Sequence, residues 1–120
     1  HICKIGNMES IRTWAYVRDA VRAYYLLART DKYGEIFNIG GETIKSIQEV
    51  LDYLLSISRL NKDNIKFEVD PKLLRKADVN IQTVDITKLK NTIDWKPEIP
   101  FEKTISDILQ FWRNEINERE

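Results

Sequence analysis

Hydrophobic and polar residues follow two different periods along this chain, and together these periods predict alternating helices and short strands. Apolar residues recur every three or four positions over 16–29, from 46 to a break at 61–64, over 85–93 and from 101 to about 118. This spacing places one apolar stripe along a helix. In the last helix we expect one set of side chains to be buried, namely Ile105, Ile108, Leu109, Trp112 and Ile116.

The sequence also predicts where two of the helices begin. Ser46 and Glu49 have the spacing of a capping box, in which the serine accepts the Glu49 amide and the glutamate accepts the Ser46 amide. Asp85 has the position of a cap for the short third helix. Extended structure is predicted between the helices, over 2–5, 12–14, 35–39, 65–69 and 79–84.

These elements predict a small mixed α/β domain. The segment 35–39 reads as a compact, buried strand ended by Gly40-Gly41. That glycine pair lacks the G-x-G-x-x-G pattern and does not open a helix directly, so no dinucleotide-binding unit is predicted. We therefore expect one domain, residues 1–120, without a Rossmann half.

Composition excludes several classes. The chain has 120 residues, 42% of them hydrophobic and 32% charged, with a net charge of zero, which gives no broad field for nucleic acid or membranes. Its only cysteine is Cys3 and its only histidine is His1, so neither a disulfide nor a zinc site is expected. The single cysteine favours a reducing, cytoplasmic setting. No apolar run approaches ~20 residues, so no membrane span is expected, and no signal peptide is visible. The chain starts without methionine and is interpreted as a piece of something larger.

Candidate chemistry lies at 73–79, between two predicted strands. Here Arg75 precedes Asp78 by three residues, and a second arginine, Arg12, stands before the first long helix. An arginine fork donates two parallel hydrogen bonds to phosphate oxygens, and a carboxylate accepts sugar hydroxyls. We hypothesise that the three side chains meet and hold a sugar nucleotide. The alternatives are surface ion pairs for the arginines and a turn cap for the carboxylate.

Other side chains have less specific chemistry. Trp14 either stacks on a ligand or packs in the core, and Asp19 either orients Arg12 or caps the backbone, the structural role being preferred. Trp95 and Trp112 are predicted core residues. No tyrosine is followed four residues later by lysine, and no Ser/His/Asp set is possible, so no catalytic group is predicted.

Several segments in order resemble one family. The run 6–14 followed by 16–25 resembles the entry to the substrate-binding half of extended short-chain dehydrogenase/reductases, and 34–41 resembles their G-E-x-x-N-I-G strand. Residues 69–79, Asp85, Lys88 and 95–102 are similar to the C-terminal part of GDP-mannose 4,6-dehydratases, and nearly the same pattern occurs in GDP-6-deoxy-mannose reductases.

The resemblance implies that Arg12 and Arg75 contact the nucleotide diphosphate and that Asp78 contacts ribose. Asn7 and Trp14 complete the predicted substrate-binding set. The family usually has proline at the position of Lys76, which leaves that loop less rigid or adds a phosphate contact. It often has aspartate at the position of Thr13, which bears on the orientation of Arg12.

In the family, an N-terminal part binds NADP and carries the catalytic residues. There the sugar C4 is oxidised, water is lost across C5 and C6, and hydride returns at C6. The expected function here is to hold GDP-mannose for that missing part, with no cofactor, metal or catalytic residue in this chain. A reductase or epimerase acting on another sugar nucleotide, and a free-standing binding module, are the alternatives. Apolar area left by the missing part predicts self-association.

Overall fold

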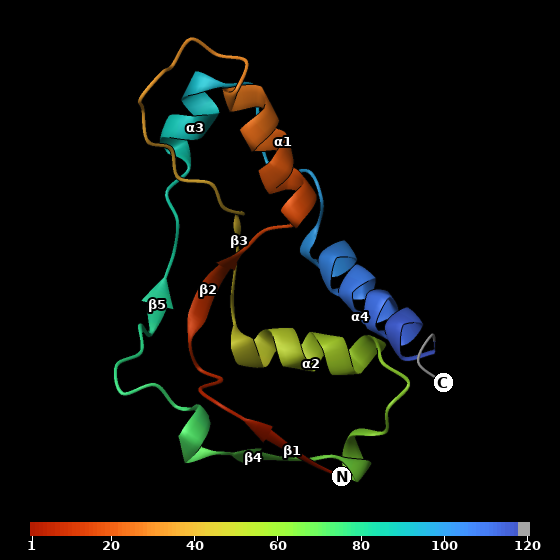
Figure 1. The fold of residues 1–120 in the computed structure, drawn as a ribbon. Helices are drawn as coiled ribbons and strands as arrows, with labels where there is room; N and C mark the ends of the chain where they lie inside the picture. The colour runs from red at the N-terminus through yellow and green to blue at the C-terminus, as the bar shows by residue number, and fades with distance from the viewer. Residues whose placement is uncertain (118–120) are drawn as a thin grey trace.

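The computed structural model describes residues 1–117 (Figure 1). Helices are α1 (Val17–Leu27), α2 (Ile47–Ile57), α3 (Thr87–Thr92) and α4 (Phe101–Asn117). Strands are β1 (Ile2–Ile5), β2 (Ile11–Trp14), β3 (Thr43–Ser46), β4 (Lys66–Val69) and β5 (Ile81–Gln82). Two short 3-10 turns, η1 (Lys62–Asn64) and η2 (Pro71–Leu73), flank β4. The predicted mixed α/β architecture is confirmed.

The strands form two small sheets. β1 pairs in parallel with β4, and β2 lies between antiparallel β3 and parallel β5. The chain therefore returns three times, at β3, β4 and β5, to the segment that contains β1 and β2. These returns determine which residues lie near Arg12.

The capping box at the start of α2 is confirmed. The Glu49 amide donates to Ser46 Oγ over 3.1 Å, and the Ser46 amide donates to Glu49 Oε2 over 2.7 Å. Two further amides at this helix start, those of Ile47 and Gln48, donate to the carbonyls of Ser10 and Met8. The helix start is thereby fastened to the loop between β1 and β2.

The main core lies between α1, α3 and the connector that precedes α4. Ala23, Leu89 and Trp95 are 0%, 0% and 4% exposed, and Ile86 and Ile93 complete the cluster. Asp19 in α1 is buried beside it, where its Oδ2 accepts the amides of Glu98 and Ile99. This confirms the structural role expected for Asp19 and the core position of Trp95.

The strand predicted at 35–39 is wrong. These residues carry no strand, and Ile36 is 85% exposed instead of buried. A strand needs a neighbouring strand to satisfy its backbone groups. None of the strands in residues 1–117 pairs with this segment, so its β-forming sequence has no ladder to join. The extended run predicted at 79–84 is likewise reduced to the two residues of β5.

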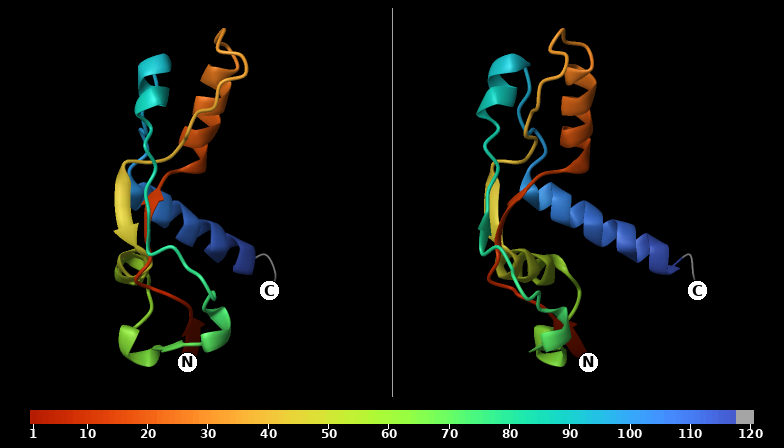
Figure 2. Two further views of the ribbon diagram at one scale, coloured as in Figure 1. Left: turned by 90° about the vertical axis from the view of Figure 1, so that its left-hand side faces the viewer. Right: turned by 60° about the vertical axis from the view of Figure 1, so that its left-hand side comes forward.

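The burial predicted for α4 is also wrong in large part. Phe101 and Ile105 are buried and Leu109 is half-buried, but Ile108, Trp112 and Ile116 are 46%, 54% and 57% exposed. Figure 2 shows α4 projecting away from α1 and α3, and the two buried apolar residues of this helix, Phe101 and Ile105, lie in its first two turns. The predicted end of this helix near Glu118 lies outside the described residues.

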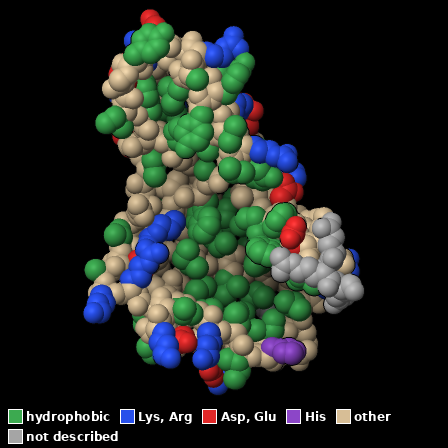
Figure 3. Space-filling model, viewed as in Figure 1, with side chains coloured by type: hydrophobic (Ala, Val, Ile, Leu, Met, Phe, Trp, Pro, Cys, Tyr) green, Lys and Arg blue, Asp and Glu red, His purple; other side chains and the backbone are tan. Residues whose placement is uncertain are grey.

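The chain is open for its size. Its radius of gyration is 17.6 Å, whereas a compact domain of this length has about 14 Å. Its accessible surface is 9277 Å², which exceeds by about 2,500 Å² the surface of a compact monomer of this mass. Figure 3 shows hydrophobic side chains in the hollow bordered by β2, α2 and α4. Much apolar surface is therefore left uncovered by the chain itself.

Candidate functional site

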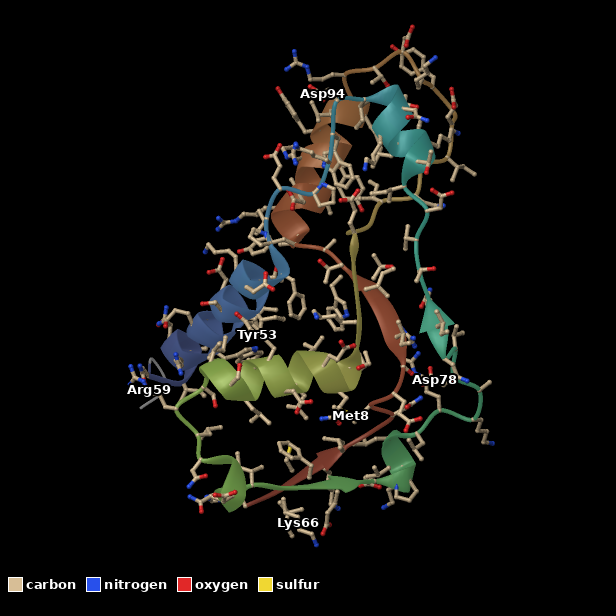
Figure 4. All side chains as sticks on the ribbon, turned by 180° about the vertical axis from the view of Figure 1, so that it is seen from behind. Met8, Tyr53, Arg59, Lys66, Asp78 and Asp94 are labelled. Atoms are coloured by element: carbon tan, nitrogen blue, oxygen red, sulfur yellow. The ribbon has the colours of Figure 1, made fainter. Side chains whose placement is uncertain are left out.

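A pocket of about 270 Å³ lies where the loop between β1 and β2 meets the segment that follows η2. Its lining residues come from four parts of the chain and are Asn7, Ser10, Arg12, Ile47, Leu73, Arg75 and Asp78. Figure 4 shows Asp78 near the end of β2 that faces β1 and β4. The two arginines and the carboxylate singled out in the sequence are thus brought to one pocket.

Backbone contacts place these segments side by side. The Asp70 amide donates to the Ile5 carbonyl over 2.9 Å, and the Ile11 amide donates to the Asn80 carbonyl over 2.7 Å. Both ends of the segment that carries Arg75 and Asp78 are therefore fastened to the β1–β2 region. Gly6 permits the approach, since a Cβ there would lie 3.1 Å from the Leu73 carbonyl oxygen.

Asp78 is surrounded by donors. Its Oδ2 accepts from Asn7 Nδ2 over 2.9 Å and from Ser10 Oγ over 3.0 Å, and its Oδ1 lies 3.4 Å from Arg12 Nη2. These donors favour the charged carboxylate. The hydrogen bond from Asn7, then that from Ser10, and further the charge of Arg12, lower the pKa of Asp78 below its ordinary value of 3.8. The group is therefore an anion at neutral pH.

The two arginines differ in their partners. Arg12 is 24% exposed in its side chain, and besides Asp78 it donates from Nη1 to the Ile11 carbonyl over 2.8 Å. Arg75 is exposed, and within residues 1–117 it has neither a hydrogen bond nor an ion pair. One guanidinium is thus held in place and the other is available. Both keep N–H groups for an anion in the pocket.

Trp14 does not belong to this pocket. Its Nε1 donates to the Lys45 carbonyl over 3.1 Å, and its ring lies edge-on to Phe101 at a centroid distance of 6.4 Å. It lines a separate cavity with the connector residues 97–101. The packing alternative considered for Trp14 agrees with this geometry.

Thr13 and Lys76 are the two residues that depart from the family pattern, and the structure shows where each lies. Thr13 Oγ1 accepts the Val84 amide over 3.2 Å, so the Thr13 side chain holds the segment between β5 and α3. The carboxylate that contacts the Arg12 side chain is that of Asp78. Lys76 is exposed and lies outside the pocket.

Ser10 is the site residue that the sequence did not reveal. It is 3% exposed, and its hydroxyl donates to Asp78 while accepting from Asn7 Nδ2 over 2.9 Å. A lone serine in a polar turn has no distinguishing pattern in the sequence. Only its burial and its long-range partner single it out.

The glycine pair at 40–41 has a packing role, because a Cβ on Gly41 would lie 1.6 Å from the Trp14 carbonyl oxygen. Among residues 1–117 there is no group of three His, Cys, Asp or Glu side chains placed to hold a metal ion. In the same range no helix has the length and apolar character to span a membrane.

Fold and site together define a mixed α/β piece with a pocket lined by two arginines and one aspartate. Comparison of the sequence then shows that the chain belongs to the GDP-mannose 4,6 dehydratase family, whose pattern matches residues 1–108. GDP-mannose 4,6 dehydratase 2 of Arabidopsis thaliana is 30% identical over 102 residues, covering 84% of this chain and 26% of the relative. GDP-6-deoxy-D-mannose reductase of Pseudomonas aeruginosa is 24% identical, with 96% of this chain and 37% of the relative covered.

The fold is also found in solved structures of such enzymes. The structure of RMD from Pseudomonas aeruginosa complexed with NADPH superposes with a TM-score of 0.83, at 22% identity, over 95% of this chain and 36% of that chain. The sequence therefore spans roughly a quarter to a third of the proteins that it matches. The family resemblance read from the sequence is confirmed.

Proposed function

We propose that this chain is the substrate-binding part of a GDP-mannose 4,6-dehydratase and that it holds the diphosphate of GDP-mannose. The observation that carries the proposal is the pocket in which Arg12, Arg75 and Asp78 meet. Its two guanidinium groups exceed its one carboxylate, which suits a ligand with negative charge. The chain would contribute binding and orientation, and chemistry would belong to other parts of the protein.

Arg75 is the group most directly suited to phosphate. It is exposed, unpaired within the described residues, and beside the pocket. Arg12 would supply the second contact from a more fixed position. The ribose contact assigned to Asp78 remains a prediction, in which sugar hydroxyls would compete with Asn7 and Ser10 for the same carboxylate.

The open form of the chain supports a role as one part of a larger fold. About 2,500 Å² of surplus surface is comparable with what a large, permanent interface hides on one side. We infer that residues 1–120 are one substrate-binding domain and that a dinucleotide-binding part, which takes NADP, covers the apolar surface. This argues against a free-standing binding module.

Binding of nucleotides to the full-length protein tests the proposal. Calorimetry should show GDP binding more tightly than UDP or dTDP, GMP binding more weakly, and guanosine hardly at all, because the diphosphate supplies the charge. The absence of binding by all three diphosphates at millimolar concentration would contradict the proposal.

A GDP-6-deoxy-mannose reductase is the second candidate, favoured by the match to a reductase over 96% of this chain. Both enzymes bind GDP, so the test must follow the product. GDP-mannose that loses one water without added reductant indicates the dehydratase. Activity that requires added NADPH and a keto sugar indicates the reductase. A clear preference for UDP or dTDP would instead favour an epimerase or dehydratase of another sugar nucleotide.

A further inference from the structure

The contacts of the Asp78 carboxylate with Asn7, Ser10 and Arg12 point to a role beyond the proposed ligand contact. Its Oδ2 takes two donors, Asn7 and Ser10, and its Oδ1 faces Arg12. A carboxylate has about four acceptor positions. With one oxygen held by two donors, the carboxylate cannot rotate without breaking hydrogen bonds, so the direction of the other oxygen is determined.

Ser10 is itself firmly held. The residue is 3% exposed, and its carbonyl accepts the Ile47 amide at the start of α2 over 3.1 Å. A serine hydroxyl has a single proton, and here it is directed to Asp78 while Asn7 donates to the same hydroxyl oxygen. Asn7 is restrained in turn, because its Oδ1 accepts the Glu9 amide over 3.0 Å. The donors to Asp78 therefore belong to a rigid turn.

The charges explain why such an arrangement would help an anion bind. A carboxylate close to Arg12 offsets part of the positive charge that a phosphate would meet. Asn7 and Ser10 stabilise negative charge on the oxygen that does not contact Arg12. The carboxylate therefore weakens the attraction between Arg12 and a phosphate only in part. In return, the flexible arginine has a fixed position before any ligand arrives. Pre-organisation of this kind raises affinity.

We propose that Ser10 and Asn7 are positioning residues that set Arg12 for phosphate binding through Asp78, as a polar latch. The latch consists of Asn7, Ser10, Asp78 and Arg12, and joins residues that lie 66 to 71 positions apart in the sequence. The effect of the latch on phosphate binding rests on the proposed function. The hydrogen bonds and ion pair that form the latch rest on the geometry alone. It gives Asp78 a role through Arg12 that differs from a contact with ribose.

A comparison of two ligands separates those roles. Inorganic pyrophosphate carries the diphosphate charge without a pentose, so a loss transmitted through Arg12 weakens pyrophosphate and GDP alike. Ser10→Ala in the full-length protein should raise Kd for both ligands by the same factor, about fivefold. Ser10→Thr keeps the hydroxyl and should restore most of the affinity. Ser56→Ala removes an exposed hydroxyl that bonds only to the Tyr53 carbonyl, and should change neither Kd.

Two outcomes overturn the latch. Unchanged affinity in Ser10→Ala for both ligands removes the positioning role, and a loss confined to GDP assigns Asp78 to the pentose. If the wild-type protein binds neither ligand, the proposed function is refuted, but this result does not test the latch. The second measurement then decides, because NMR of the Asp78 carboxyl should show titration at higher pH in Ser10→Ala than in wild type. An unchanged titration overturns the latch by itself.

Discussion

Around Trp95, apolar side chains from α1, α3 and the connector exclude solvent, whereas around Asp78 the chain segments meet through hydrogen bonds and an ion pair. In the first region Ala23 and Leu89 are fully buried. In the second region the arginine and carboxylate remain about a quarter exposed and only Ser10 is buried. We therefore expect stability and the proposed ligand binding to depend on different ends of the molecule, so that substitutions separate the two.

The largest expected effect concerns the apolar region. Trp95→Ala removes a 4% exposed ring and the hydrogen bond from its Nε1 to the Asp19 carbonyl, and should lower the free energy of unfolding by ~3–5 kcal/mol. Trp112→Ala is the matched control, since that ring is 54% exposed and should cost less than about 1 kcal/mol. Denaturant unfolding followed by circular dichroism measures both. If both substitutions lowered the free energy of unfolding equally, the Trp112 face of α4 would be covered in solution.

The next effect concerns the polar region. Arg75→Ala should weaken GDP binding by ~1.5–3 kcal/mol, because a charge-assisted hydrogen bond to phosphate is lost. The free energy of unfolding should hardly change, since Arg75 is exposed and unpaired in residues 1–117. Lys76→Ala removes the neighbouring charge outside the pocket and should have a smaller effect on binding. Equal losses in the two variants would reduce the site to a general basic surface.

A smaller effect is expected at the start of α2. Ser46→Ala breaks the capping box and should cost ~1 kcal/mol in thermal or denaturant unfolding. Hydrogen bonds from the Ser46 amide and hydroxyl lower the pKa of Glu49 below its ordinary value of 4.5. The lowered pKa stabilises the fold above pH 4.5, and this contribution is lost as pH falls through the folded-state pKa. In Ser46→Ala that acid-dependent loss should shrink, and an identical pH profile would contradict the assigned cause.

The weakest effect is association of the 120-residue chain with itself. Val17, Ile108, Phe111 and Trp112 line an apolar groove of about 400 Å³ between α1 and α4, and each side chain is about half exposed or more. Exposed apolar patches favour association. Sedimentation should show an average mass that rises with concentration, and Trp112→Glu should reduce the rise. A single monomeric species at high concentration would contradict this prediction.

Local rules in the sequence were sufficient for the helices, the strands β1, β2 and β4, and the capping box at Ser46, because each depends on neighbours a few positions away. Periodicity could not show which apolar stripes are covered. It marked Ile108, Trp112 and Ile116 as core, although about half of each side chain is exposed. The strand predicted at 35–39 was wrong because a strand exists only where another strand pairs with it, and local sequence does not show that partner.

The site shows the same division. Residue types and the family resemblance singled out Arg12, Arg75 and Asp78, because guanidinium and carboxylate groups carry recognisable chemistry. Only the tertiary structure brought in Ser10, removed Trp14 from the pocket and directed Asp78 toward Arg12. The contacts of Ser10 and Asp78 depend on the parallel return of β4 beside β1 and on the contact of Asn80 with Ile11, and the position of Trp14 depends on Lys45 and Phe101. Pairings between residues so far apart in the chain leave no local pattern, so the sequence alone does not specify them.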